Sequence, residues 1–215
     1  MKPLMGNISE ELASLLYKRG NRREFGENEH IFGEGDKASS LPIVISGRTK
    51  MVHFLENGKE VIIGIFHAGE MFALPPVIDG KKYPAAAIAM ERTQLLLLNR
   101  GEFLGLINES SEFAFAVIEW MSAMLREKTA TIQNLATASP EHRVGNVLLR
   151  IAKDEGDTFP VRIPLRREDI ANMAGLTTET TIRVIRRLEK KGFLNIEHGK
   201  IVIEDNSGLM QLVEG

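Results

Sequence analysis

Four charged residues in the C-terminal part of the chain have the spacing of one helix face. Their positions step by four, three and four residues, and they are Glu179, Arg183, Arg186 and Lys190. An arginine can donate two hydrogen bonds to guanine O6 and N7, and a glutamate can accept one from cytosine N4. A glutamate facing DNA would otherwise repel phosphates, so this stripe, which begins with Thr178, favours base reading. A surface ion pair between Glu179 and Arg183 is the alternative.

The segments around this stripe have the order of a helix-turn-helix. Residues 165–174 predict a short helix, Gly175-Leu176 a tight turn, and Thr177 the cap of a second helix that runs to about Lys191. The β-prone runs 194–196 and 200–203, joined through 197–199, predict a small hairpin or wing. The inward stripe of the second helix is expected to contain Thr177, Thr181, Val184 and Leu188, with Ile185 beside it.

Charge is distributed unevenly along the 215 residues. Residues 161–200 contain nine lysines and arginines against five acids, a net charge of +4. Because the whole chain carries −2, the remainder carries −6. A basic end on an acidic body is expected of a polyanion-binding module joined to another domain.

The N-terminal half has the sequence pattern of an antiparallel β-domain. After a helix that begins at Ser9, short β-prone runs alternate with glycines, at 41–45, 49–55, 61–66, 85–90 and 93–98. This spacing favours a sandwich or barrel over βαβ units. Asn57-Gly58 predicts a hairpin turn, because both residues tolerate a positive φ.

The middle of the chain is predicted to be helical. A short helix near 100–107 precedes a long one from about Ser111. In the long helix, the positions 118, 121, 125, 128, 132 and 135 step by 3, 4, 3, 4 and 3 residues, and all but Lys128 are apolar. This seam fits either a dimeric coiled coil or packing on the chain's own β-domain, and Lys128 interrupts it. Pro140 marks a hinge before a helix over 141–153. We therefore expect an α+β protein with a cupin-like β-roll at 1–110, a dimerisation helix at 111–138 and a winged helix-turn-helix domain at 139–215.

Composition excludes several function classes. The chain has no cysteine, which rules out disulfides, thiolate-bound iron–sulfur clusters and cysteine-based zinc sites. No apolar run approaches the roughly 20 residues of a membrane span, so a cytoplasmic protein is expected. No metal-binding histidine pair, nucleophile–base motif, P-loop or dinucleotide fingerprint is present, so a cupin-type enzyme is a minor alternative and we expect no catalytic or metal site.

Several motifs resemble landmarks of the CRP/FNR family of bacterial transcription regulators. Residues 176–183 resemble the recognition helix of that family, and His198-Gly199-Lys200 resembles its wing. The glycine motifs of its cyclic-nucleotide-type β-roll are matched by Phe32-Gly33-Glu34-Gly35-Asp36, Ile45-Ser46-Gly47, Asn57-Gly58-Lys59-Glu60 and Gly69-Glu70-Met71-Phe72. The order and spacing of these motifs over nearly the whole chain are specific.

The resemblance implies a homodimeric regulator that binds a palindromic DNA operator, with an effector in the β-roll and RNA polymerase as a protein partner. Glu179 and Arg183 would read bases, and Thr178 would tune the half-site. The implied phosphate contacts are Arg167, Thr177, Thr180, Arg186 and Lys200. The implied dimer contacts are Ile118, Met121, Leu125, Ile132 and Leu135.

The expected effector site departs from the best-known members of the family. Their cyclic AMP pocket uses a Gly-Glu pair for the ribose and an Arg-Ser pair for the phosphate. Gly69-Glu70 is present, but the second pair corresponds to Tyr83-Pro84, which lacks a charged donor. The sequence thus disfavours a cyclic nucleotide and leaves open either a small apolar or organic effector near a loop over 72–78 or no effector. Plain core packing is the alternative for that apolar loop. The residues expected to line that pocket are Gly69, Glu70, Phe72, Leu74 and Tyr83.

Haem is a further alternative for the sensor domain. The family's carbon monoxide sensor holds haem through a cysteine and a histidine, and the corresponding stretch here, 73–76, offers no ligand. Haem needs one or two axial ligands, and three histidines occur in the β-domain. They are His30, His53 and His67.

Overall fold

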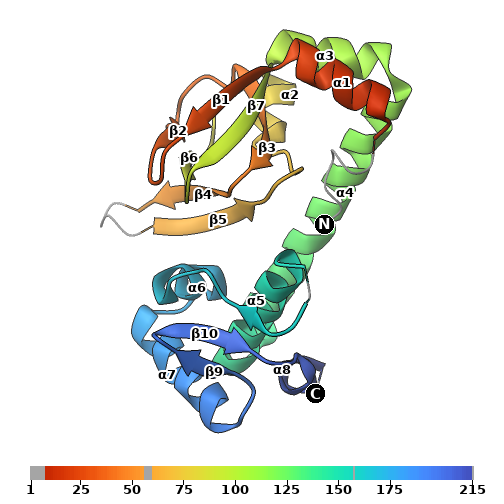
Figure 1. Ribbon diagram of the computed structural model, residues 1–215. Coiled ribbons are helices and arrows are strands. Elements are labelled where there is room, and N and C mark those ends of the chain that lie inside the picture. The colour runs from red at the N-terminus through yellow and green to blue at the C-terminus, as the bar shows by residue number, and fades with distance from the viewer. Residues whose placement is uncertain (1–7, 56–59, 157, 215) are drawn as a thin grey trace. The chain divides into compact units, whose positions relative to one another are not determined.

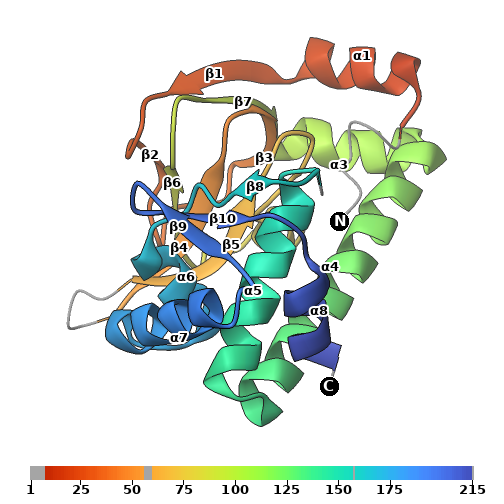
Figure 2. The same ribbon diagram turned by 60° about the horizontal axis from the view of Figure 1, so that its bottom comes forward.

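The computed structural model describes residues 8–55, 60–156 and 158–214, with the side chains of 130, 131, 133–137 and 214 left aside. The chain forms two compact units, Met1–Glu127 and Lys128–Gly215, which are described separately (Figures 1 and 2). Within the described residues, no helix is long and apolar enough to cross a membrane.

Two antiparallel sheets form the β-roll of the first unit (Figure 1). One has the order β1-β7-β3 and the other the order β2-β6-β4-β5. The five predicted strands are confirmed, whereas the sequence did not predict β1, whose first four residues are exposed, or the three-residue β2. The strands are β1 Asn21–Phe25, β2 His30–Phe32, β3 Ser40–Ser46, β4 Thr49–Phe54, β5 Glu60–Phe66, β6 Ala86–Ala89 and β7 Thr93–Asn99. The Asn57-Gly58 turn lies outside the described residues.

The segment expected to be an apolar loop at 72–78 is instead largely helix α2, Leu74–Asp79. That expectation was wrong because Pro75 and Pro76 suggest irregular backbone. Prolines are tolerated in the first turn of a helix, where the amide N–H groups have no intrahelical partner. The Arg100 guanidinium holds the end of α2 by donating from Nε to the Val77 carbonyl (2.8 Å) and from Nη2 to the Ile78 carbonyl (3.1 Å).

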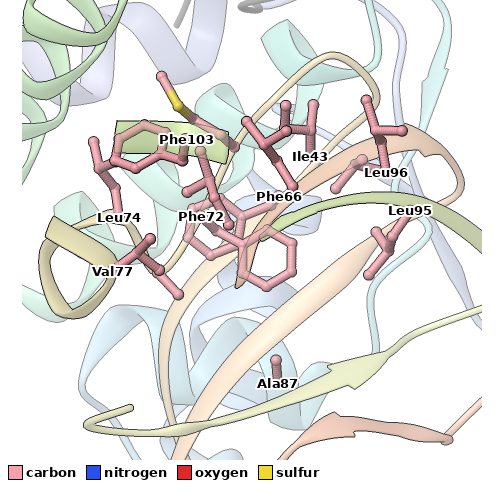
Figure 3. Packing of buried hydrophobic residues seen from close by; sticks show 14 of the residues in the cluster. Ile43, Phe66, Phe72, Leu74, Val77, Ala87, Leu95, Leu96 and Phe103 are labelled. Carbon is pink, nitrogen blue, oxygen red and sulfur yellow. The ribbon is translucent and has the colours of Figure 1, made fainter. Parts of the chain in front are cut away.

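Aromatic and aliphatic side chains fill the space enclosed by the roll and α2. Figure 3 shows the Phe66 and Phe72 rings against each other; their centroids lie 5.0 Å apart. Phe103, from helix α3 (Arg100–Glu109), meets Phe113 edge to face at 5.9 Å. These contacts join the roll to the helices that follow it.

The long helix α4, Ser111–Thr137, has two different apolar stripes. Phe113, Val117 and Trp120 are buried in the core of the first unit. A second stripe is exposed: Ile118 by 56%, Met121 by 41%, Leu125 by 70% and Ile132 by 67%. Helix α4 therefore packs on its own β-domain through residues other than the seam, and a dimer contact of the exposed seam stays a prediction. Leu135 was expected to continue the exposed stripe, but its side chain is not among those that the structure describes.

Helix α1, Glu10–Arg19, is fastened to the start of α4. Its predicted cap is confirmed, because Ser9 Oγ accepts a hydrogen bond from the Leu12 N–H. The Ser9 N–H and Oγ also donate to the two carboxylate oxygens of Glu112, at 2.6 and 3.0 Å. This contact ties the N-terminal helix to the first turn of α4.

The second unit packs helices against a three-stranded antiparallel sheet of order β8-β10-β9. The helix predicted over 141–153 is α5, and the predicted helix-turn-helix and hairpin are also present. The sequence did not predict β8, which has two residues, or the C-terminal helix α8. The elements are α5 Pro140–Asp154, β8 Val161–Arg162, α6 Arg167–Ala174, α7 Thr178–Lys190, β9 Asn195–Glu197, β10 Lys200–Ile203 and α8 Ser207–Glu214.

Candidate nucleic-acid interface

Helix α7 is amphipathic in the way the sequence predicts. Thr181, Val184, Ile185 and Leu188 are buried in the second unit. Thr177 is not part of this inward stripe, so that expectation was wrong. It is the N-cap residue and is exposed, and its Oγ1 accepts a hydrogen bond from the Thr180 N–H at 3.2 Å. Because this stripe of α7 is buried, the opposite stripe of the helix faces solvent.

The outward stripe of α7 is exposed along its whole length. Glu179, Arg183, Arg186 and Lys190 all lie there. Within the part of the chain that the structure describes, Glu179 and Arg183 form no ion pair with each other. Arg183 instead donates from Nη2 to Thr180 Oγ1, at 3.2 Å. The guanidinium and the Glu179 carboxylate are therefore available to an external partner.

A short hydrogen-bond chain organises the first turn of α7. Thr180 Oγ1 accepts from both the Thr177 hydroxyl (2.9 Å) and Arg183. Neither bond uses the Thr180 hydroxyl proton, which can therefore be donated to an acceptor outside the protein. A phosphate oxygen is such an acceptor, and exposed donors near a helix N-terminus commonly bind one.

Ile182 is a residue of this face that the four-three-four stepping missed. It is 36% exposed on α7 and follows Glu179 by three residues, so it lies next to the charged stripe. A β-branched apolar side chain beside a base-reading stripe can contact the thymine methyl group. Counting every outward position of the helix, and not charged ones alone, would have found it.

The wing is a two-residue hairpin turn. His198 and Gly199 have φ of 49° and 79°, the left-handed values that the favoured type of hairpin turn requires at both positions. Lys200 follows at the start of β10 and is exposed. Arg167, at the start of α6, donates from Nη2 to the Gly199 carbonyl at 3.2 Å. Burial lowers the pKa of Arg167, which nevertheless stays charged. This contact joins the helix-turn-helix to the tip of the wing.

Helix α5 contacts the helix-turn-helix through two charged side chains of its first turn. Glu141 accepts hydrogen bonds from Lys191 Nζ (2.7 Å) and Arg187 Nη1 (3.4 Å), which hold the pKa of its carboxyl below the ordinary value. Arg143 donates from Nη1 to the carbonyls of Ala174 (3.4 Å) and Gly175 (3.5 Å), in the turn before α7.

The residues expected to line an effector pocket divide into two groups. Gly69 and Glu70 share a turn in which Glu70 Oε2 accepts from the His67 N–H at 2.9 Å. The other three expected residues, Phe72, Leu74 and Tyr83, are buried in the core of the roll.

Tyr83 is held within that core by two contacts. Its ring stacks on Phe32 with centroids 3.7 Å apart, and its hydroxyl donates to the Ser40 carbonyl at 2.6 Å. Burial raises the pKa of Tyr83, so the hydroxyl stays protonated. The tyrosine is therefore already bonded inside the protein.

The three histidines considered for haem are on different parts of the β-domain. His30 lies on β2, His53 lies on β4, and His67 follows β5. His53 pairs through Nδ1 with Glu34 Oε2 at 2.9 Å. The described part of the chain contains no group of three histidine or carboxylate side chains arranged to hold a metal ion.

Comparison with known proteins gives the same two-part division. Residues 22–110 match the model of the cyclic nucleotide-binding domain, and residues 142–212 match that of the Crp-like helix-turn-helix domain. Together the two models span most of the chain.

Relatives match this chain over both parts. The chain is 26% identical to the cyclic AMP receptor protein of Thermus thermophilus, over 99% of this chain and 97% of that protein. It is also 26% identical to the nitrogen fixation regulation protein FixK of Azorhizobium caulinodans, over 93% and 82% of the two chains. The solved structure of FixK2 from Bradyrhizobium japonicum has the same fold, with a TM-score of 0.81 and 23% identity over 90% of this chain and 96% of that one. The chain therefore belongs to the CRP/FNR family of transcription regulators, and its second unit is the helix-turn-helix DNA-binding domain of that family.

Proposed function

We propose that this regulator binds a palindromic operator as a homodimer, with α7 of each subunit in the major groove. The observation that carries this proposal is the exposed stripe of α7, whose Glu179 and Arg183 are not paired with each other in the described structure. An ion-paired stripe would have favoured an ordinary solvated surface.

Within this arrangement, Thr178, Glu179 and Arg183 are the base-reading residues. Their place in the first two turns of α7 supports this assignment, because recognition helices reach base edges with their N-terminal residues. Ile182 lies beside them and extends the proposed reading surface.

Contacts to the DNA backbone are proposed for the residues around that surface. The hydroxyl proton of Thr180 and the exposed side chains of Thr177, Arg186 and Lys200 support this role. Arg167 already donates to the wing, and its remaining guanidinium N–H groups can donate to a phosphate.

The exposed apolar stripe of α4 is the proposed dimer interface. Three of its residues, Ile118, Leu125 and Ile132, are more than half exposed in the single chain. They are spaced by seven residues, as in a coiled-coil seam. A two-fold dimer presents two α7 helices and therefore requires a symmetric site.

The effector proposed for the β-roll is a small organic molecule and not a cyclic nucleotide. The residues present do not fit a cyclic phosphate, because the Tyr83 ring is stacked on Phe32 and its hydroxyl is bonded to Ser40. Two buried polar atoms of this unit, Thr49 Oγ1 and Trp120 Nε1, have no hydrogen-bond partner among the described residues. A polar group of an effector would satisfy such an atom.

Selection from a random DNA pool tests the proposed function. We expect the full-length protein to enrich an inverted repeat whose half-site centres lie about one helical turn, roughly 34 Å, apart. A fluorescently labelled copy of the enriched duplex then gives the affinity. Enrichment of no sequence, or of a single half-site, would contradict the proposal. RNA polymerase, the proposed protein partner, can be added to the same duplex to look for a ternary complex.

A further inference from the structure

The first turn of α5 holds the recognition helix near both of its ends. Glu141 contacts Arg187 and Lys191, in the last turn and at the C-cap of α7. The Glu141 side chain is only 22% exposed, and its low pKa keeps it ionised at neutral pH. A half-buried carboxylate with two cationic partners fixes geometry better than an isolated surface pair.

The second contact lies at the other end of α7. Arg143 donates to the carbonyls of Ala174 and Gly175, at the end of α6. Gly175 has φ of 62°, so the chain reverses there before Thr177 begins α7. The last carbonyls of a helix lack intrahelical partners, and here an arginine supplies the donors.

These two contacts also connect α7 to the helix that follows the proposed dimer interface. Helix α4 ends at Thr137, and α5 begins three residues later, capped by Ser139.

We infer that Glu141 and Arg143 are positioning residues that fix the recognition helix relative to α5 and thereby determine sequence specificity. We call this pair the α5 clamp. It has a second effect, because Glu141 neutralises Arg187 and Lys191 and reduces their attraction for DNA phosphates of any sequence. The inference rests on the proposed DNA-binding function and deepens it.

Glu141→Gln tests the clamp in the full-length protein. It keeps the shape of the side chain but removes the charge, so α7 is held less firmly and two cations are released. We expect the affinity for the selected operator to fall about three- to tenfold. We expect the affinity for random-sequence duplex not to fall, and its salt dependence to steepen by up to ~1.8 in slope. Anisotropy titrations on both duplexes at several salt concentrations measure these changes, and Glu11→Gln on α1 is the matched control.

A charge exchange separates positioning from simple destabilisation. The double variant Glu141→Lys with Lys191→Glu rebuilds the pair in reverse, and we expect it to recover at least half of the operator affinity that Lys191→Glu alone loses. Arg143→Lys keeps the positive charge but lacks the planar guanidinium with its several donors. We expect it to lower operator affinity about two- to threefold without weakening binding to random duplex.

The outcomes that overturn the inference are distinct from those that overturn the proposed function. A parallel loss of affinity for operator and random duplex in Glu141→Gln would overturn the clamp, because it would indicate general destabilisation. A charge-exchange variant no better than Lys191→Glu would do the same, and would make Lys191 a direct DNA contact. If the unmodified protein enriches no sequence, the proposed function itself fails.

Discussion

The two units use their functional surfaces in opposite ways. In the second unit, α7 keeps charged side chains exposed across the proposed reading stripe, and within the described structure they do not pair with each other. In the first unit, Tyr83, at the position where the resemblance to the family would place a cyclic-phosphate contact, is stacked on Phe32 and bonded to Ser40. The comparison supports the proposal that this chain reads DNA as the family does. It does not support the proposal that the chain binds the cyclic nucleotide of the best-known members.

The largest expected effect concerns the face of α4 that would bring two reading helices together. Leu125→Glu places a charge in the exposed seam and should convert the protein to a monomer in sedimentation experiments. Operator affinity should fall about 100-fold or more, because the second half-site is no longer bound by a linked subunit.

The matched control for that variant is Arg126→Glu, at the next residue of α4, which is exposed and lies off the seam. We expect it to remain dimeric. A dimer that persists in Leu125→Glu would place the subunit interface elsewhere.

The second prediction tests the reading stripe itself. Arg183→Ala should weaken operator binding by roughly 1–3 kcal/mol, because a guanine contact is lost, with little change on random duplex. Arg162→Ala, which removes an exposed arginine from β8 and not from α7, is the control. Equal losses on both duplexes would make Arg183 a backbone contact and remove the basis for comparing the two units.

How well the sequence predicted each region follows from the range of the interactions involved. Helix α7 was predictable because its buried and exposed stripes repeat at helical spacing within one segment. Strand β1 was not, since its residues Asn21–Glu24 are polar and exposed, and pairing with β7 is what makes them a strand. Helix α2 was missed because its two prolines suggest irregular backbone, although they lie in the first turn, where a helix tolerates them.

The site shows the same limit. The spacing of Glu179 and Arg183 located the proposed reading surface, but not whether the two side chains pair with each other. The contacts from Arg167 to Gly199 and from Glu141 to Lys191 join residues 32 and 50 positions apart. No periodicity indicates such contacts. They depend on how α5, α6 and the wing pack in three dimensions.

The third prediction concerns the interior of the roll. Tyr83→Phe should lower the free energy of unfolding by about 1 kcal/mol, because the hydrogen bond to the Ser40 carbonyl is lost. Operator affinity should stay the same. Chemical denaturation and anisotropy measure the two quantities, with Tyr17→Phe as the control. A change in operator affinity at unchanged stability would show that Tyr83 takes part in sensing, and the contrast between the units would then weaken.

The smallest expected effect separates the wing from the reading helix. Lys200→Ala should weaken binding to operator and random duplex alike, by about two- to fivefold, because one phosphate contact is lost. The slope of log affinity against log salt should become shallower by about 0.9. An unchanged slope would place the wing away from the DNA backbone.

A double variant tests whether Arg167 acts through the wing, because Arg167 bonds to the neighbouring Gly199. A loss in Lys200→Ala that disappears in an Arg167→Ala background would show that it does. If the losses of the two single variants add in the double variant, Arg167 is a separate phosphate contact, as the resemblance of the chain to the family implies.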